Sequence, residues 1–435
     1  MLKLKNILCG AALLTGTWGI AQQTPAPRQT ASVLITGAVA HIGNGSTINN
    51  SAIGFKDGKI TYAGPLSGVT TGAYDRVIDA SGKHVYPGFI AANSTLGLVE
   101  VDAVRASNDQ SDTGDLIPHV RSIVAYNSES KVVESCRPNG ILMAQVAPRG
   151  GLISGTSSVV QLDAWNWEDA AIKTDDGIHL HWPSAFRSKG WGFSGPSEFV
   201  PNKDYEKEIG EIRTFISGAK TYLSGPKSPE NLPYQAVSGL FDGSQKLYVN
   251  VDGEKEIADV VRFAKTNGIR HMVVVGGNEA WKVADLLVEN DVPVILSRPH
   301  RLPSGEDDNV KQPYLLAKIL SDKGVLVGLE MSGAMERMNT RNLPFYAGTF
   351  AAYGLDKEKA VQLITGNNAR ILGIDAFAGT LETGKDATLF ISEGDALDMR
   401  TNSIPHAYIQ GREISLESHQ TQLWKRYMGK YEAGQ

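Results

Sequence analysis

Strand and helix patterns alternate between residues 241 and 372, and this alternation constrains the fold more than any other feature. Short segments rich in β-branched residues predict strands, and amphipathic segments between them predict helices. Parallel neighbours need long crossover connections, so the alternation predicts a parallel sheet covered by helices. The expected strands are 247–251, 272–276, 292–297 and 325–331, and the expected helices include 254–267 and 279–289.

The region before this alternation is less regular. Residues 141–147 and 157–162 are apolar enough to be earlier strands of the same sheet. Residues 163–202 hold four tryptophans among many glycines and prolines. We interpret this stretch as a long ordered insertion lying over one face, because long loops in compact domains usually carry structure of their own.

Both ends of the chain have β character. Residues 32–84 alternate apolar and polar positions and are interrupted by turn-forming pairs such as Asp57-Gly58 and Ser81-Gly82. Residues 375–417 return to the same pattern. A β unit at each end, with an α/β region between them, predicts one small domain built from both termini. Residues 418–435 are expected to be a C-terminal tail.

The first residues have the pattern of an export signal. Lys3 and Lys5 precede an uncharged, mostly apolar run at 7–20, and small residues follow at 19–21. This predicts a signal peptide at 1–21, a linker at 22–31 and a periplasmic location. A short membrane anchor is the alternative, although the run is too short to span a bilayer. No second apolar segment of spanning length follows in the sequence.

Charge and cysteine content exclude some classes of function. The 42 basic and 47 acidic residues give a net charge of −5, which argues against a nucleic-acid-binding surface. Removal of the predicted signal would leave Cys136 as the one cysteine. A single cysteine cannot form an internal disulfide, and nothing resembles a cysteine-rich metal site.

Several phrases together resemble the amidohydrolase superfamily, of the imidazolonepropionase and Xaa-Pro dipeptidase kind. PGFIAANSTLGL at 87–98 is similar to its first barrel strand. The other phrases are the N-terminal GFKDGKITYAG and VIDASGKHVYPGFI, and then AVQLITGNNARILGI at 360–374, GTLETGKDATLFI at 379–391 and AYIQGREI at 407–414. The resemblance implies an α/β fold, a TIM-type (β/α)8 barrel over 85–374, with a small composite β-sandwich.

The resemblance also implies an activity, metal-assisted hydrolysis of C–N bonds in cyclic amides or dipeptide-like substrates. In such barrels the chemistry takes place at the carboxyl ends of the strands. Family members end the first strand in His-x-His, and both imidazoles hold the metal. Here those positions are Asn93 and Thr95, and the later ligand positions align with Asn250, Gly276 and Ser332.

These five residues are poor metal ligands. Divalent transition metals need imidazole, thiolate or carboxylate donors, whereas amide and hydroxyl oxygens are neutral and glycine has no side chain. Without a metal, water keeps a high pKa and is a weak nucleophile at neutral pH. We therefore expect no metal cofactor at the usual place. The five positions remain candidates for contact with a ligand.

Two histidines could bind a metal elsewhere. His179 and His181 form a true His-x-His, and on an extended segment both side chains point to the same face. The pair does not follow a recognisable barrel-strand phrase, so the competing interpretation is a loop or edge strand with packed or solvated imidazoles. A divalent metal is expected only if ligands have been relocated in this way.

Two carboxylates offer another kind of chemistry. Glu330 lies two residues before Ser332, and Asp252 two residues after Asn250. If both reach the barrel mouth, they could form an acid–base pair or bind a hard cation. The structural alternative is a buried pair, or a solvated Asp252 at the start of a helix.

Two hypotheses follow. The first is a non-catalytic barrel that binds a small molecule or a partner, either a related active subunit or a second copy of itself. The second is a hydrolase of C–N bonds that works with relocated metal ligands or without a metal.

Overall fold

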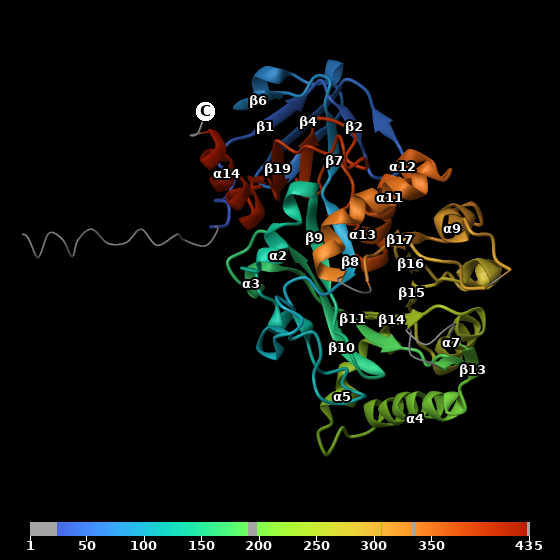
Figure 1. Ribbon diagram of the computed structural model, residues 1–435. Helices are drawn as coiled ribbons and strands as arrows, with labels where there is room; N and C mark the ends of the chain where they lie inside the picture. Colours follow the sequence, from blue (N-terminus) through green and yellow to red (C-terminus); the bar gives the residue numbers. More distant parts are fainter. Residues whose placement is uncertain (1–23, 190–197, 306, 333–335, 433–435) are drawn as a thin grey trace, which may run out of the picture.

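The computed structural model describes residues 24–189, 198–305, 307–332 and 336–432. The predicted signal peptide at 1–21 lies outside these residues, as do 190–197 of the expected insertion. Two sheets form a small domain at one end of the molecule, and a larger barrel sheet with its helices forms the rest (Figure 1). None of the described helices is both long and apolar enough to cross a membrane.

The larger sheet is an eight-stranded barrel that is nearly closed. The hydrogen-bonded order is β17-β16-β15-β14-β11-β10-β9-β8, and a bridge between Ala92 and Glu330 joins the two ends. Asn368 links β8 and β17 at the seam where the barrel closes, because its side-chain amide donates to the carbonyls of Ile90 and Leu329. The strands are β8 (Phe89–Ser94), β9 (Ile141–Val146), β10 (Ile153–Gln161), β11 (Ala171–His181), β14 (Lys246–Val251), β15 (Met272–Gly276), β16 (Val294–Leu296) and β17 (Val327–Leu329).

The expected α/β barrel is confirmed, with one departure from strict (β/α)8 order. Strand β10 runs antiparallel to both β9 and β11, and the other neighbouring strands are parallel. The connection at 147–152 is too short for a crossover helix, so the chain can only turn back as a hairpin. The sequence pattern predicted the strand but not its direction.

The interpretation of 163–202 as an insertion is corrected by the structure. Residues 171–181 form barrel strand β11, which pairs in parallel with β14 from Gly177 to His181. The polar run Lys173–Asp176 obscured the strand, because its first half is only partly buried. In the described part of 163–202, the short helix α3 (Trp167–Ala170) and the hairpin strands β12 (Phe186–Lys189) and β13 (Glu198–Pro201) lie outside the barrel sheet.

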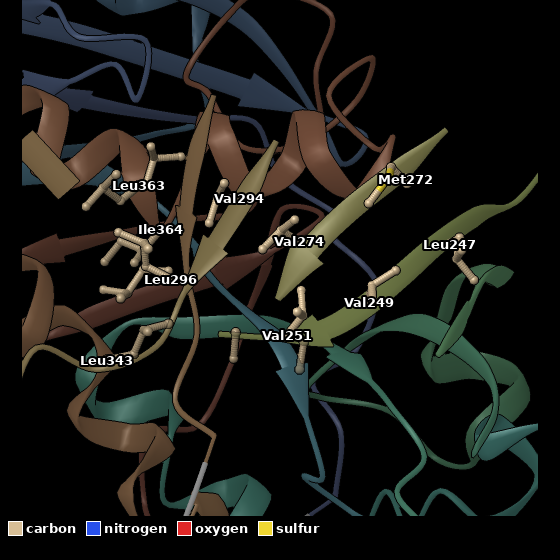
Figure 2. Packing of buried hydrophobic residues seen from close by; sticks show 14 of the residues in the cluster. Leu247, Val249, Val251, Met272, Val274, Val294, Leu296, Leu343, Leu363 and Ile364 are labelled. Atoms are coloured by element: carbon tan, nitrogen blue, oxygen red, sulfur yellow. The ribbon is translucent and has the colours of Figure 1, made fainter. Parts of the chain in front are cut away.

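Helices pack against the outside of the barrel. Alternate residues of β14, β15 and β16, such as Leu247, Val249 and Val274, point outward into the main apolar core (Figure 2). The longer helices are α4 (Tyr205–Ser224), α7 (Glu254–Asn267), α9 (Gln312–Asp322), α11 (Leu343–Ala352), α12 (Lys357–Leu363) and α13 (Gly366–Leu372). The shorter ones are α2 (Lys131–Glu134), α5 (Leu232–Ala236), α6 (Gly239–Asp242), α8 (Ala284–Glu289) and α10 (Glu336–Asn339).

The inward-facing positions form a second core. Ile90, Met143, Tyr248, Val275 and Ile295 from five different strands are fully or almost fully buried in one cluster. The lower part of the barrel is therefore packed solid, as in other barrels of this type. Polar residues lie instead toward the carboxyl ends of the strands.

The small domain draws strands from both termini, as predicted. One sheet has the order β5-β4-β1-β6, and the other has the order β20-β19-β18-β7-β2-β3. The first contains β1 (Val33–Thr36), β4 (Ser51–Lys56), β5 (Lys59–Pro65) and β6 (Arg76–Asp79). The second contains β2 (Val39–His41), β3 (Thr47–Ile48), β7 (His84–Pro87), β18 (Leu389–Ser392), β19 (His406–Ile409) and β20 (Arg412–Glu413).

The expected C-terminal tail contains a helix. Residues 419–432 form α14 (His419–Glu432), which lies beside the small domain (Figure 1). Its first backbone N–H, that of His419, donates to Glu134 at 2.6 Å. None of its side chains is buried, and its apolar residues are spaced as on an amphipathic surface helix.

A buried carboxylate connects the barrel to both chain ends. Asp163 follows β10 and accepts hydrogen bonds from the Ala26 N–H at 2.9 Å, from Arg137 at 2.8 Å and from Arg412 at 3.0 Å. The Asp163 side chain is 2% exposed. Its negative charge neutralises the guanidinium of Arg137, just before β9 of the barrel, and that of Arg412, in β20 of the small domain.

We expect Asp163→Ala to lower the free energy of unfolding by about 3–5 kcal/mol, because it leaves two largely buried guanidinium groups without their shared counter-charge. Urea unfolding followed by circular dichroism would measure this. Asp322→Ala on α9 removes an exposed partner of Lys318 and should cost no more than about 1 kcal/mol. Equal losses for both variants would contradict the assigned role of Asp163.

Candidate functional site

Polar residues converge at the carboxyl ends of the barrel strands. Asn93 is the next-to-last residue of β8, and its φ of 46° is unusual for a residue other than glycine. The Asn93 N–H donates to Gln145 of β9 at 3.0 Å. Gln145 in turn donates to Asp176 of β11 at 2.8 Å. These bonds link β8, β9 and β11 through one buried polar layer.

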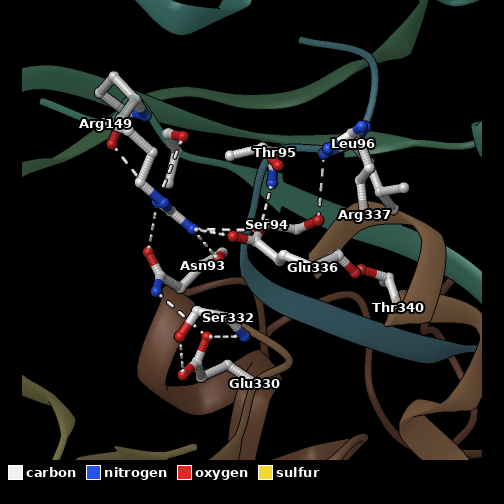
Figure 3. A network of polar contacts seen from close by, with 12 residues as sticks. Asn93, Ser94, Thr95, Leu96, Arg149, Glu330, Ser332, Glu336, Arg337 and Thr340 are labelled. Atoms are coloured by element: carbon white, nitrogen blue, oxygen red, sulfur yellow. Dashed lines mark hydrogen bonds and ion pairs between the residues drawn. The ribbon is translucent and has the colours of Figure 1, made fainter. Parts of the chain in front are cut away.

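The carboxyl ends of the barrel strands surround the mouth of the barrel, and the carboxylate of Glu330 lies at its centre. It is fully buried, and each of its oxygens accepts two hydrogen bonds. One oxygen accepts from the hydroxyls of Ser297, at 2.8 Å, and Ser332, at 2.5 Å. The other accepts from the Ser332 N–H at 2.7 Å and the Asn93 amide at 3.3 Å (Figure 3). The geometry gives the carboxylate four donors and leaves neither oxygen without one.

Burial raises the pKa of Glu330 to about 7, although the hydrogen bonds from Ser332 and Ser297 favour its charged form. The nearby Glu336 raises the pKa further, and Arg149 lowers it. The carboxyl therefore changes charge near neutral pH, although it is closed off from solvent.

Arg149 brings a positive charge to the same place. It lies on the hairpin between β9 and β10, and its guanidinium donates to the side chain of Asn93 at 3.0 Å and to the Asn93 carbonyl at 2.7 Å. It also donates to both oxygens of Glu336 at 3.1 Å (Figure 3). The Thr95 N–H donates to Glu336 at 2.8 Å. The end of β8 is therefore fixed by one ion pair.

Asn250 and Gly276, which also align with metal ligands of the family, contribute to the local backbone structure of their strands. The amide of Asn250, at the end of β14, donates to the Leu180 carbonyl at 3.4 Å. Gly276 ends β15 with a φ of +97°. The positive φ favours glycine, and a Cβ there would also lie 2.6 Å from the carboxylate of Asp252, which would have to move.

The donor set does not fit the metal that the resemblance implies. The five positions present two amides, two hydroxyls and no side chain at Gly276, and a guanidinium bonds directly to Asn93. A fixed cation beside weak neutral donors disfavours a second cation. Within the described ranges, no three His, Cys, Asp or Glu side chains are placed to share a metal ion.

The histidine pair lies where the sequence interpretation did not place it. His179 and His181 end barrel strand β11, and they pair with Tyr248 and Asn250 of β14. They therefore belong to the mouth rather than to a peripheral loop, which corrects the expectation. The His179 ring stacks on Tyr248 with centroids 4.9 Å apart.

The ring nitrogens of this pair have few partners. His179 is fully buried, and neither of its ring nitrogens has a hydrogen-bond partner among the described residues; nor does Nε2 of His181. Burial, followed by the charge of Arg149, lowers the pKa of His181 to about 4. The same two causes, in the same order, hold the pKa of His179 well below its usual value. Both imidazoles are therefore neutral at pH 7 and free to accept or donate.

The two carboxylates singled out in the sequence, Glu330 and Asp252, have different hydrogen-bond partners. Glu330 and Ser332 do come together, but Asp252 accepts from the Asn278 N–H at 3.2 Å and has no hydrogen bond to Glu330. Asp252 is also exposed. The structure thus places Glu330 in the polar network of the mouth, and no hydrogen bond links Asp252 to Glu330.

Two site residues were missed in the sequence. Arg149 lies in Arg-Gly-Gly, a pattern too short to carry a signal, and Glu336 lies in a helical stretch with no motif. The position of Arg149, directly after a predicted strand end at 147, was the one available indication. In a parallel barrel, residues after a strand lie at the active face.

Comparisons with known proteins agree with the architecture. Residues 234–414 match the model of the Amidohydrolase family. A 5-methylthioadenosine/S-adenosylhomocysteine deaminase of Symbiobacterium thermophilum is 24% identical over 396 residues, which cover 83% of this chain and 84% of the deaminase. An amidohydrolase from Thermotoga maritima is similar in structure, with a TM-score of 0.73, 20% identity, and coverage of 88% of this chain and 99% of that chain. A Xaa-Pro dipeptidase has a TM-score of 0.52, 12% identity, and coverage of 88% and 100%.

We expect Glu330→Gln to gain stability relative to the natural chain as pH rises. The folded state holds the Glu330 proton up to a pKa of about 7, so the natural chain loses stability as pH rises from about 4.5 through 7. Glutamine does not titrate, and it can still accept from the Ser332 N–H and donate to the serine hydroxyls. The difference in unfolding free energy between the two proteins should shift by on the order of 1–3 kcal/mol in favour of the variant between pH 5 and pH 8.

Urea unfolding at the two pH values would measure this shift. Glu211→Gln, at an exposed position on α4, is the matched control and should show almost none. If the difference in unfolding free energy between Glu330→Gln and the natural chain is the same at both pH values, Glu330 does not titrate near pH 7.

Proposed function

We propose that this chain, which carries an amidohydrolase family domain, binds a small amide-type molecule at its barrel mouth without the family's metal-assisted hydrolysis. The family resemblance drawn from the sequence is confirmed by the match of residues 234–414, and the similar solved structures agree with the fold. The ligand, the absence of turnover and the loss of the metal site are part of the proposal.

The contact between Arg149 and Asn93 carries this proposal. Asn93 stands where the family's first metal-binding histidine would stand, and the guanidinium bonds to both its side chain and its carbonyl. The positive charge at the mouth is thus provided by the chain itself. A guanidinium can orient a carbonyl or a carboxylate, but it cannot bind and deprotonate water as a metal does.

The state of Glu330 supports the same conclusion. A general base needs a free lone pair directed at the proton that it takes. Both Glu330 oxygens are already engaged by two donors each, and the side chain is buried. Glu330 is therefore suited to hold the mouth in shape, with its charge balanced by Arg149 nearby.

A hydrolase with relocated ligands is the second candidate, and the histidine pair favours it. A buried imidazole without hydrogen bonds costs about 1–3 kcal/mol for each orphaned group, unless water or a ligand satisfies it. His179 and His181 end one barrel strand at the active face, and three of their ring nitrogens are unpartnered among the described residues. Neutral imidazole is a good ligand for zinc, which would activate a bound water.

Metal analysis and a turnover assay on the same sample separate the two candidates. We expect purified protein to contain far less than one zinc, iron, manganese or copper ion per chain. We also expect it to leave N-acyl amino acids, cyclic amides and Xaa-Pro dipeptides unhydrolysed by mass spectrometry, with or without added zinc. Stoichiometric metal that is lost in His179→Gln with His181→Gln, but retained in His271→Gln, would instead establish the second candidate. His271 is an exposed histidine just before β15 and is the matched control.

Ligand binding is tested by calorimetry with the same compounds. We expect one class to bind, and Arg149→Met to weaken it about tenfold, which corresponds to roughly 1.4 kcal/mol. Arg149→Lys keeps the charge but not the planar fork, so an intermediate loss is expected. If all the compounds fail to bind the natural chain, or if Arg149→Met binds equally well, the proposed role of the mouth is wrong.

Export is a further part of the proposal and rests on the charged and apolar pattern of residues 1–21. When the chain is expressed in a bacterium with two membranes, we expect it in the periplasmic fraction. Its intact mass should correspond to loss of the first 21 residues. Recovery of the uncleaved chain from the cytoplasm would contradict this.

A further inference from the structure

Helix α14 presents a continuous apolar stripe to solvent. Trp424, Tyr427, Met428 and Tyr431 are 63%, 56%, 38% and 67% exposed. They occupy positions i, i+3, i+4 and i+7 of one helix, so their side chains form a single row along one face. Scattered exposed apolar residues are ordinary, but four large ones in one row indicate a surface that binds something.

The rest of the helix is basic. Lys425, Arg426 and Lys430 lie between the stripe residues, and Glu432 is the one acidic residue within α14. Lys425 is paired with Glu417 at 2.8 Å, whereas Arg426 and Lys430 lie over the rings of Tyr427 and Tyr431. The positive charge of this helix contrasts with the net charge of −5 of the whole chain.

We propose that α14 lies along the surface of an anionic lipid bilayer. A helix with aromatic residues on one face and Lys or Arg on the other is the pattern of interfacial helices. Tryptophan and tyrosine favour the headgroup level, because each has an apolar ring and a polar group. The helix lies beside the small domain, at one edge of the molecule in the view of Figure 1.

The charge distribution favours lipid over a second copy of the chain. In a symmetric pair the same patch meets itself, so Arg426 and Lys430, which lie over the stripe rings of Tyr427 and Tyr431, would come close to their counterparts on the other α14. Juxtaposed like charges oppose such a contact. Anionic headgroups would instead attract each basic residue that comes near the surface. This proposal does not depend on what the barrel mouth binds.

Co-sedimentation with vesicles tests the proposal on the full mature chain. We expect binding to vesicles of phosphatidylcholine with phosphatidylglycerol, and much weaker binding to phosphatidylcholine alone or at high salt. Trp424→Ser with Tyr431→Ser should reduce the bound fraction by about fivefold or more, because the stripe supplies the buried apolar area. Arg426→Gln with Lys430→Gln should abolish the preference for anionic lipid.

Trp165→Ser is the matched control, because Trp165 is also 63% exposed but lies on a loop before α3. It should bind vesicles as the natural chain does. Failure of the natural chain to bind anionic vesicles would overturn the proposal, whether the chain is then a monomer or a dimer. A dimer by light scattering that dissociates in the Trp424 and Tyr431 variant would assign the stripe to a second copy.

Discussion

Closure of the barrel at the seam between β8 and β17 is the constraint on which the rest of the structure depends. Regular pairing gives way there to one bridge, between Ala92 and Glu330, and side chains complete the closure. Asn368 joins the two strands within the seam, and Glu330 joins the end of β17 to Asn93 and Ser297. The residues that close the sheet therefore also form the floor of the mouth.

This dual use explains why a charged group can be tolerated in the interior. A buried carboxylate is costly unless hydrogen bonds and an opposite charge compensate it. Glu330 has four donors, and the Arg149–Glu336 pair lies across Asn93. Removing one member would leave its partners unsatisfied, so the mouth behaves as one unit rather than as separate residues.

The sequence predicted most of the architecture and little of the site. Strand 272–276 and helix 254–267 coincide with β15 and α7, because their apolar periodicity is strong and their ends carry turn signals. Strand β11 was missed because half of it is polar, and the direction of β10 was missed because periodicity is the same in both directions. Glu330 was identified from its spacing to Ser332, but its partner Arg149 comes from a distant hairpin with no local motif.

The reversed strand β10 has a consequence for how the mouth obtains its charge. Because β9 and β10 form a hairpin, Arg149 lies on a short connection anchored by strands on both sides. A metal centre has two compositions, loaded and empty, which depend on supply, on competing chelators and on pH. A guanidinium that is part of the chain is always present, so a mouth that carries it has a single composition. It is complete once the barrel has folded, and no shortage of metal in the surroundings can remove it.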